Sequence, residues 1–233
     1  MKQLRLGLIV PSSNTTMESE YGRVLPDNIT LHTCRMRLRD VTVEALVEMK
    51  RSVEEEALKL ADAQVDIIGY GCTSGSLIKG LHHDEEIVSK IERVANLPAV
   101  ATAGAVVDAL KYLKTRKVVV AAPYIDEINN LEKKFLDENG FEVIEIKGLS
   151  IIENTKIGLT KGSAVIDLVK SLNYQDAEGV FISCTNLPTM KLIEKLERDL
   201  QKPVISSNTT TLWSMLKKSG HDVKIEGVGR FFA

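Results

Sequence analysis

The landmarks at which short apolar runs end recur along the chain at a fixed distance. One β-branched run ends at Val10-Pro11 and another at Ala122-Pro123, so the two prolines stand 112 positions apart. Cys72 and Cys184 each directly follow an apolar run, and they are separated by the same 112 positions. A shared spacing of this kind indicates an internal repeat of about half the chain.

A third pair of landmarks falls in the same order. Pro98 and Pro203 each precede a short apolar run and stand 105 positions apart, so one loop has changed its length between the halves. Three ordered pairs are much harder to obtain by chance than one. They predict two α/β halves related by duplication.

Short apolar runs alternate with longer amphipathic segments throughout the sequence. Residues 43–61 place apolar side chains at helical spacing, whereas residues 118–121 form a continuous apolar run typical of a strand covered on both faces. We therefore predict an α/β fold of two pseudo-symmetric Rossmann-like lobes, each a mostly parallel sheet flanked by helices. The expected strands are residues 5–10, 29–37, 65–70, 99–101, 117–121, 142–146, 179–183, 203–206 and 223–227.

The repeat also predicts where the lobes begin and end. Residues 1–103 together with 209–233 are expected to form the first lobe, and residues 104–208 the second. In this scheme the strand at 223–227 returns to the first lobe. No long linker separates the halves, so we expect them to pack closely with an active site in the cleft between them.

Composition and charge exclude several classes of protein. The 233 residues carry 30 Lys and Arg against 32 Asp and Glu, and this balance gives no basic surface for nucleic acid. The apolar run at residues 6–10 is far shorter than the roughly 20 residues that a membrane span needs. We expect a cytoplasmic protein, and a homodimer or higher homo-oligomer because dimers are the commonest soluble assemblies.

Small hydroxyl and amide side chains follow the predicted strands, where parallel sheets bind their ligands. The pentapeptide Ser-Ser-Asn-Thr-Thr occurs at residues 12–16 and again at 206–210. Each such segment opens a candidate helix, whose free N–H groups favour an anion. Routine helix capping is the alternative explanation, and the two roles are compatible. The candidate anion-binding residues from these strand ends are Ser12, Asn14, Thr73, Ser74, Tyr124, Thr185, Asn186 and Asn208.

Cys72 and Cys184 occupy equivalent positions in the two halves. A lone cysteine at the end of a strand is usually a packing residue. If the halves face one another, however, the two sulfurs approach a bound ligand from opposite sides. Helix N-termini are expected to lower a thiol pKa from about 8.5 toward neutrality. One thiolate beside one thiol suits proton transfer or covalent addition at carbon. Cys34 lies inside an alternating strand and is interpreted as structural.

Neither a metal nor a cofactor is expected. The three cysteines are odd in number and lack Cys-x-x-Cys spacing. The glycine-containing segments at 158–162 and 227–229 lack the spacing of a phosphate-binding or dinucleotide-binding loop.

These motifs together resemble the aspartate/glutamate racemase superfamily, and within it the branch of maleate cis-trans isomerases and arylmalonate decarboxylases. The resemblance covers essentially the full length and is carried by residues 10–18, Cys72, Pro123-Tyr124, residues 153–155 and Cys184. It implies two pseudo-symmetric α/β lobes, no cofactor and an interdomain active site.

The resemblance also implies roles for single residues. In maleate isomerases the cysteine of the first half, here Cys72, adds to the alkene as a thiolate, and the resulting single bond can rotate. The cysteine of the second half, here Cys184, supplies and then removes the proton on the neighbouring carbon. Asn14, Tyr124 and Asn154 match positions that hold the substrate carboxylates.

The expected function is isomerisation of a small dicarboxylate, maleate to fumarate. Arylmalonate decarboxylases look like enzymes that keep only the second cysteine, so the presence of Cys72 argues against simple decarboxylation. A racemase or decarboxylase that uses the same thiols stays open, and so does a non-catalytic binder of small anions. The polar segment at 73–76 departs from the more apolar sequence of maleate isomerases, which leaves the identity of the diacid open.

Overall fold

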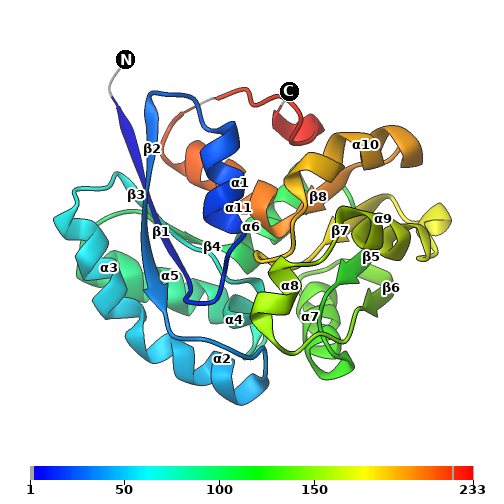
Figure 1. Cartoon of the computed structure of the whole chain (residues 1–233), viewed down its shortest axis with the longest axis horizontal. Coiled ribbons are helices and arrows are strands. Elements are labelled where there is room, and N and C mark those ends of the chain that lie inside the picture. Colours follow the sequence, from blue (N-terminus) through cyan, green and yellow to red (C-terminus); the bar gives the residue numbers. More distant parts are fainter. Residues whose placement is uncertain (1–2, 222, 233) are drawn as a thin grey trace.

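The computed structural model describes residues 3–221 and 223–232, and its first sheet lies in the N-terminal part of the chain. Four parallel strands, β1 (Leu4–Pro11), β2 (Ile29–Met36), β3 (Ile67–Tyr70) and β4 (Ala99–Ala101), pair in the order β2-β1-β3-β4. Figure 1 shows this sheet on the left of the molecule.

The second sheet repeats the order of the first. Its strands β5 (Lys117–Ala122), β6 (Glu142–Gly148), β7 (Gly179–Ile182) and β8 (Val204–Ser206) are parallel and pair as β6-β5-β7-β8. Each strand of the first sheet thus has its counterpart in the second sheet, four strands later along the chain. The two-lobe α/β fold with mostly parallel sheets is confirmed, and eight of the nine predicted strands are present with ends that shift by at most two residues.

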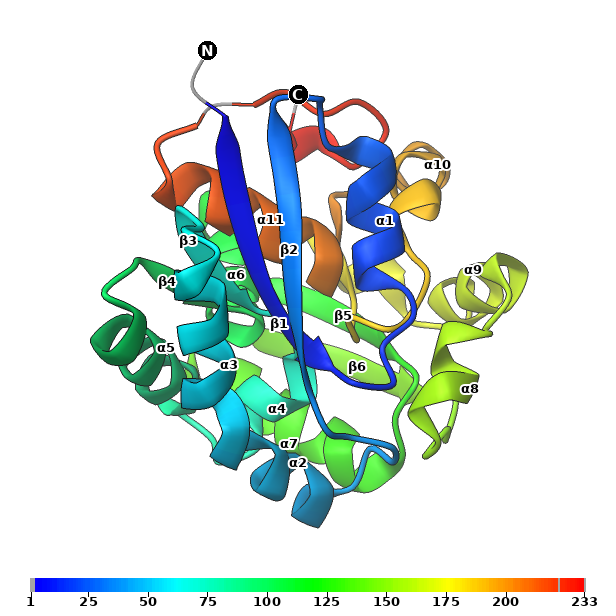
Figure 2. The same cartoon turned by 60° about the vertical axis from the view of Figure 1, so that its left-hand side comes forward.

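Helices connect the strands and cover the sheets (Figures 1 and 2). In Figure 1, α2, α3 and α5 lie beside the first sheet, and α7, α9 and α10 lie beside the second. The helices are α1 (Met17–Val24), α2 (Val43–Met49), α3 (Val53–Asp62), α4 (Thr73–Leu77), α5 (His83–Ala95), α6 (Thr102–Tyr112), α7 (Asp126–Glu138), α8 (Asn154–Gly158), α9 (Gly162–Lys170), α10 (Met190–Leu200) and α11 (Ser207–Lys218). Short 3-10 turns, η1 (Lys50–Ser52), η2 (Tyr174–Asp176) and η3 (Arg230–Phe232), complete the chain.

The two sheets share their hydrophobic core. Successive residues of a strand point to opposite faces of its sheet. One cluster of buried side chains accordingly contains Ile9 of β1 with Val119 of β5, and the other contains Leu8 with Val120. Each cluster therefore covers one face of both sheets, which explains why the strands are apolar on both faces.

The C-terminal segment is not the strand that its alternating pattern predicts. Residues 223–227 form no strand; a turn follows, and Gly227 and Gly229 have φ of +79° and +113°. Such backbone angles bend the chain out of the extended form that a strand requires. The segment instead buries Ile225 and Val228. Arg230 then reaches α10, where its side chain lies 3.1 Å from Glu197.

The boundaries predicted for the lobes, 1–103 with 209–233 and 104–208, stay a prediction. Helix α11 packs mainly against α6 and also against β3, β4 and β8. Helix α6 in turn packs against α4 and α5. Helices α6 and α11 thus each contact strands of both sheets.

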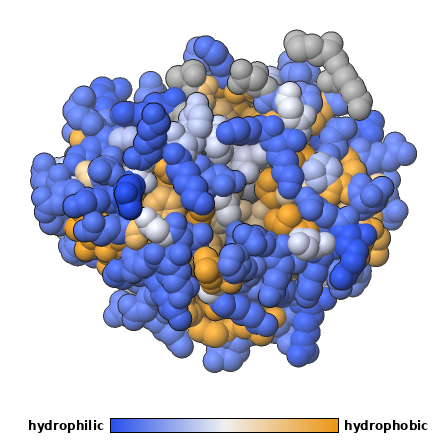
Figure 3. Space-filling model, turned by 180° about the vertical axis from the view of Figure 1, so that it is seen from behind, coloured by the Kyte–Doolittle hydropathy of each residue, from blue (hydrophilic) through white to orange (hydrophobic). Residues whose placement is uncertain are grey.

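One face of the molecule is mostly polar. Figure 3 shows the face behind that of Figure 1, where hydrophilic side chains predominate and the hydrophobic patches are small. Within residues 3–221 and 223–232, every helix is too short or too polar to cross a bilayer.

A buried carboxylate joins helices from the two halves. Glu20 of α1 accepts the backbone N–H groups of Thr189 and Met190, at 2.7 and 2.9 Å, where α10 begins. Its other oxygen accepts the side-chain amide of Asn208, the second residue of α11, at 2.6 Å. Burial raises the pKa of Glu20, although these hydrogen bonds oppose the shift. One carboxylate thus ties three helices together.

Replacement of this carboxylate tests how far the halves depend on it. Glu20→Ala leaves three buried donors without an acceptor, and we expect it to lower the free energy of unfolding by about 2–4 kcal/mol. The control is Glu18→Ala on the same helix, where a half-exposed glutamate pairs with Arg35. That change should cost less than about 1 kcal/mol. Urea denaturation followed by circular dichroism measures both, and equal losses would contradict the assigned role.

Candidate active site

Cys72 begins helix α4 directly after strand β3. Its buried thiol accepts a hydrogen bond from the backbone N–H of Gly75, with 3.3 Å between nitrogen and sulfur. The Ser74 hydroxyl lies 4.0 Å from the same sulfur. The predicted binding residue Ser74 is therefore next to the predicted nucleophile.

Cys184 follows strand β7 in a strained backbone conformation. Its φ is +92°, which residues with a side chain seldom adopt. The Ser207 hydroxyl accepts the Cys184 N–H at 3.0 Å, and the Asn186 N–H donates to the Cys184 sulfur at 3.4 Å. Strain of this kind persists where the surroundings hold it in place, and it is concentrated at functional positions.

Tyr124, which follows β5, connects the two thiols. Its buried hydroxyl is hydrogen-bonded to the Cys184 thiol, and negative charge on either Cys184 or Cys72 raises the Tyr124 pKa. Negative charge on Cys72 also raises the pKa of Cys184. The two sulfurs, one from each sheet, therefore lie within electrostatic reach of each other and of one phenol.

The expected lowering of the thiol pKa values is wrong for the empty site. Burial raises the pKa of Cys72 to about 11 and that of Cys184 to about 12. Hydrogen bonds from Gly75 and Tyr124 favour the respective thiolates, but loss of hydration is the larger effect. Helix α4 has only five residues, so its dipole is too small to compensate. Both thiols are protonated at neutral pH in the empty protein.

A second tyrosine lies beside Cys72. The Tyr70 hydroxyl is buried and has no hydrogen-bond partner within the described part of the chain. A Cβ atom added at Gly75 would come within 2.9 Å of both the Tyr70 hydroxyl and the Cys72 sulfur. Gly75 thus allows these two groups to approach a common point.

Residues 12–16 are bound to the loop that follows β7. The Asn14 amide donates to the Thr185 hydroxyl at 3.1 Å, and that hydroxyl donates to the Gly71 carbonyl at 3.0 Å. The Thr15 N–H donates to the Asn186 side chain at 2.8 Å. The carboxyl ends of β1, β3 and β7 therefore meet, as the strand-end argument predicts, and they bring residues of both halves to one site.

Several of the predicted binding side chains use their donor hydrogens in hydrogen bonds within the protein. Asn186 uses both amide hydrogens on backbone carbonyls, and Thr185 donates its single hydroxyl hydrogen to the backbone. Thr73 donates its hydroxyl hydrogen to Ser207 at 2.7 Å. The Ser12 hydroxyl bonds to the backbone of residue 38. Side chains whose hydrogens are used in this way hold the loops and have none left for a ligand.

Two of the predicted residues keep an amide hydrogen that a ligand can use, and two more place hydroxyls at the sulfurs. Asn14 and Asn154 each engage one amide hydrogen, on the hydroxyls of Thr185 and Ser13, and each retains the other. The hydroxyls of Ser74 and Tyr124 lie beside the two sulfurs. The two asparagines lie on the loops that meet at the site, and all four side chains are neutral.

Asn208 lies on the contact between α11 and α1. Its side-chain amide donates to Glu20, and its backbone carbonyl accepts the Tyr21 hydroxyl at 2.9 Å. The oxygen of its side chain has no partner within the described part of the chain. The capping explanation holds for the second pentapeptide, since Ser206 and Thr209 form a capping box at α11. In the first pentapeptide, Asn14 caps α1 through the N–H groups of residues 16 and 17.

Two residues that the sequence-based prediction of the site left out help to organise it. The Ser207 hydroxyl accepts from both the Thr73 hydroxyl and the Cys184 N–H, so it joins the two cysteine loops. Its position in the repeated pentapeptide was an available signal. Arg35 donates to the Asn14 carbonyl at 2.8 Å and so fixes residues 12–16 from outside.

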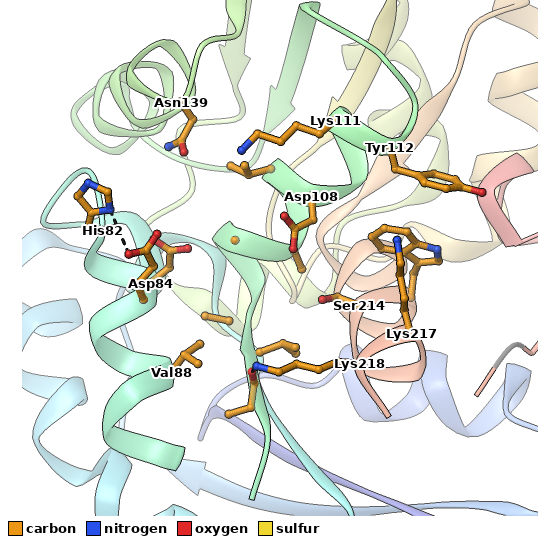
Figure 4. Close-up of a pocket in the computed structure, with 18 of the residues that line it drawn as sticks. His82, Asp84, Val88, Asp108, Lys111, Tyr112, Asn139, Ser214, Lys217 and Lys218 are labelled. Carbon is orange, nitrogen blue, oxygen red and sulfur yellow. Dashed lines mark hydrogen bonds and ion pairs between the residues drawn. The ribbon is translucent and has the colours of Figure 1, made fainter. Parts of the chain in front are cut away.

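A large cavity lies elsewhere, between α5, α6 and α11 (Figure 4). It has a volume of about 830 Å³, and neither cysteine lines it. Its walls carry charges of both signs, among them Asp84, Asp108, Lys111 and Lys217. Within the described residues, no three His, Cys, Asp or Glu side chains are arranged to hold a metal ion.

The sequence matches the family model of arylmalonate decarboxylase over residues 6–232. The chain belongs to this family. A maleate isomerase of Geobacillus stearothermophilus is 31% identical over 93% of this chain and 92% of its own. An arylmalonate decarboxylase of Bordetella bronchiseptica is 26% identical over 97% of this chain and 95% of its own.

Solved structures place this member of the arylmalonate decarboxylase family close to maleate isomerases. A maleate isomerase variant from Pseudomonas putida with maleate has a TM-score of 0.95 and 28% identity, covering 98% of this chain and 97% of that one. A cysteine-to-serine variant of the Nocardia farcinica maleate cis-trans isomerase also has a TM-score of 0.95, with 27% identity and 98% coverage of both chains. That structure carries a covalently bound succinylcysteine intermediate.

The raised thiol pKa values predict how the cysteines react. Alkylation of Cys72 and Cys184 by iodoacetamide should be slow at pH 7 and should accelerate about tenfold per pH unit up to pH 9, because the thiolate is then the minor form. Peptide mass spectrometry follows each thiol separately, with the half-buried Cys34 in the same sample for comparison. A rate that levels off below pH 8 would mean that a thiol is ionised at neutral pH.

Proposed function

We propose that this protein isomerises maleate to fumarate, with Cys72 as nucleophile and Cys184 as acid and base, and without a cofactor. The observation that carries the proposal is the pair of buried thiols, one from each sheet, within electrostatic reach of the Tyr124 hydroxyl. Two maleate isomerases at 30% and 31% identity over nearly full length support the substrate. The succinylcysteine in the Nocardia enzyme supports covalent addition.

The reaction balances with these two thiols alone. The Cys72 thiolate forms a carbon–sulfur bond to one alkene carbon, and the displaced electron pair takes the Cys184 proton at the neighbouring carbon. The product is a succinyl thioether, whose single carbon–carbon bond can rotate. The Cys184 thiolate then removes a proton from that neighbouring carbon, the double bond re-forms, and the carbon–sulfur bond breaks. Fumarate leaves, and the Cys72 thiolate is restored.

The electrostatic interaction between the sulfurs suits the different roles of the two cysteines, one as nucleophile and one as acid. Once Cys72 has lost its proton to solvent, its charge raises the pKa of Cys184 and keeps that thiol protonated. One nucleophile and one acid are therefore present together. Two thiolates at once would repel each other and the incoming dianion.

The substrate carboxylates would be held by neutral donors. The remaining amide hydrogens of Asn14 and Asn154, with the hydroxyls of Ser74 and Tyr124, are the proposed set. Because both thiols are buried in the empty protein, the substrate enters when the loops or lobes open, and closure then excludes water. We further propose a cytoplasmic protein that forms a homodimer or a larger homo-oligomer.

Cys72→Ser tests the nucleophile. A serine hydroxyl is hardly ionised at neutral pH, so we expect maleate turnover to fall on the order of 1,000-fold or more. Proton NMR of maleate and fumarate follows the conversion. The matched control is Cys34→Ser, which changes a cysteine on β2 outside the site and should leave turnover at the wild-type level. Activity of C72S near wild type would reject Cys72 as the nucleophile.

Measurements with other compounds distinguish the alternative functions. Deuterium exchange at the α-carbon of an amino acid, with maleate unchanged, would assign a racemase. Release of carbon dioxide from an arylmalonate would assign a decarboxylase. Binding of dicarboxylates without turnover of any of these compounds would leave a non-catalytic anion binder.

A further inference from the structure

Glu132 is a buried acid next to the site that the proposed reaction does not use. It lies on α7 with a fully buried side chain, and the Ser183 hydroxyl donates to one of its oxygens at 2.5 Å. Its other oxygen has no hydrogen-bond partner within the described residues. A carboxylate that is deprived of water and receives one hydrogen bond is costly, and the neutral carboxylic acid costs less because it carries no charge.

The sequence places this acid on the apolar face of its helix. Ile128 stands four positions before Glu132, and Phe135 and Leu136 stand three and four positions after it; all three are buried. Glu132 also borders a gap of about 10 Å³ whose other walls are Thr73 and apolar side chains. Thr73 has given its hydroxyl hydrogen to Ser207, so it offers none to the free oxygen of Glu132.

Glu132 is linked to the site by a hydrogen bond and by an electrostatic interaction. Ser183, its hydrogen-bond donor, is the residue immediately before Cys184. In addition, negative charge on Glu132 raises the pKa of Tyr124, whose hydroxyl is bonded to the Cys184 thiol. The carboxyl group is therefore close enough to act on any charge that enters between the two cysteines.

The ionisable groups around Glu132 leave it without a nearby cation. On the site side stand Tyr124, Cys184 and Cys72, all neutral acids in the empty protein. Helix α4, which packs against α7, carries no charged residue. The other charges of α7 and of its neighbour β6 lie at the surface. Asp126 and Glu127 are exposed at the start of α7, and the remaining charges form the pairs Lys133–Asp137, Lys134–Glu138, Lys147–Glu145 and Lys117–Glu142.

We propose that Glu132 is a positioning residue that must be neutral for a dicarboxylate to bind, so that the protein takes up a proton on Glu132 as the dianion enters. The proposal rests on the dicarboxylate site of the proposed function. Glu132 does not contact the reacting atoms; it acts through Ser183 and Tyr124. As a neutral acid it adds no repulsion to a site that already receives two negative charges.

The direction of the pH effect follows from linkage. Burial raises the Glu132 pKa to about 7, so a substantial fraction of the carboxyl is ionised just above neutrality in the empty protein. A bound dianion raises that pKa further, and the affinity for the dianion must fall as pH rises through the value of the empty protein. Cys72 and Cys184 stay protonated over this range, so they do not add to the effect.

Calorimetric titration with succinate tests the proposal without turnover, because succinate has no double bond to react. Titrations at pH 7.5 in two buffers with different ionisation enthalpies report the number of protons taken up on binding. We expect roughly 0.7 proton for the wild type and close to none for Glu132→Gln, whose amide oxygen still accepts the Ser183 hydroxyl. Glu138→Gln, a surface change on the same helix, should retain the wild-type value.

Equal proton uptake by the wild type and E132Q would overturn the proposal, and so would a failure of succinate to bind the wild type. If E132Q does not fold, carbon NMR of the wild type with labelled glutamate decides. A buried carboxyl that titrates near pH 7, and at higher pH with succinate, supports the proposal; a midpoint below pH 5 rejects it.

Maleate turnover with unchanged uptake in E132Q rejects this inference alone. Uptake on Glu132 without maleate turnover rejects the proposed reaction alone.

Discussion

The burial of polar loops between two parallel sheets is the constraint on which the rest of this structure depends. Each sheet directs the carboxyl ends of its strands toward the other, so the loops there have little access to water and must satisfy their polar groups internally. Residues 12–16 and the loop after Cys184 do so by bonding to each other, through Asn14, Thr185 and Asn186. Two of the buried groups left without a partner, the Tyr70 hydroxyl and one oxygen of Glu132, adjoin the region of the thiols.

The same burial decides the charge of the empty site. It raises the pKa of Cys72, Cys184, Tyr124 and Glu132, so every acid in this region is pushed toward its neutral form. A site built in this way accepts negative charge from a ligand more easily than one that already contains carboxylates. It is also consistent with the neutral hydroxyls of Ser74 and Tyr124 that lie next to the sulfurs.

Periodicity and spacing were sufficient for the sheets, because a strand buried on both faces must be apolar throughout and a duplication must repeat its landmarks. The pairing of Cys72 with Cys184 followed from that symmetry. The thiol pKa values did not, since the sign of the shift depends on how deeply the sulfurs are buried, which sequence does not show. Residues 223–227 alternate as a strand does, but the glycine conformations at 227 and 229 could be recognised only in three dimensions. Glu132 did leave a signal: an acid on the apolar stripe of a helix.

The two halves share their topology but not their chemistry, and the difference arises where each cysteine meets its loop. Cys72 has an extended φ of −148° and starts a helix, whereas Cys184 has a φ of +92° and is followed by a turn. Both sulfurs accept a backbone N–H, from Gly75 and Asn186 respectively, and Cys184 is in addition bonded to the Tyr124 hydroxyl. Duplication alone would provide two equivalent thiols. The proposed addition needs one thiolate and one acid, and the divergence of the two loops gives the thiols different surroundings without altering either sheet.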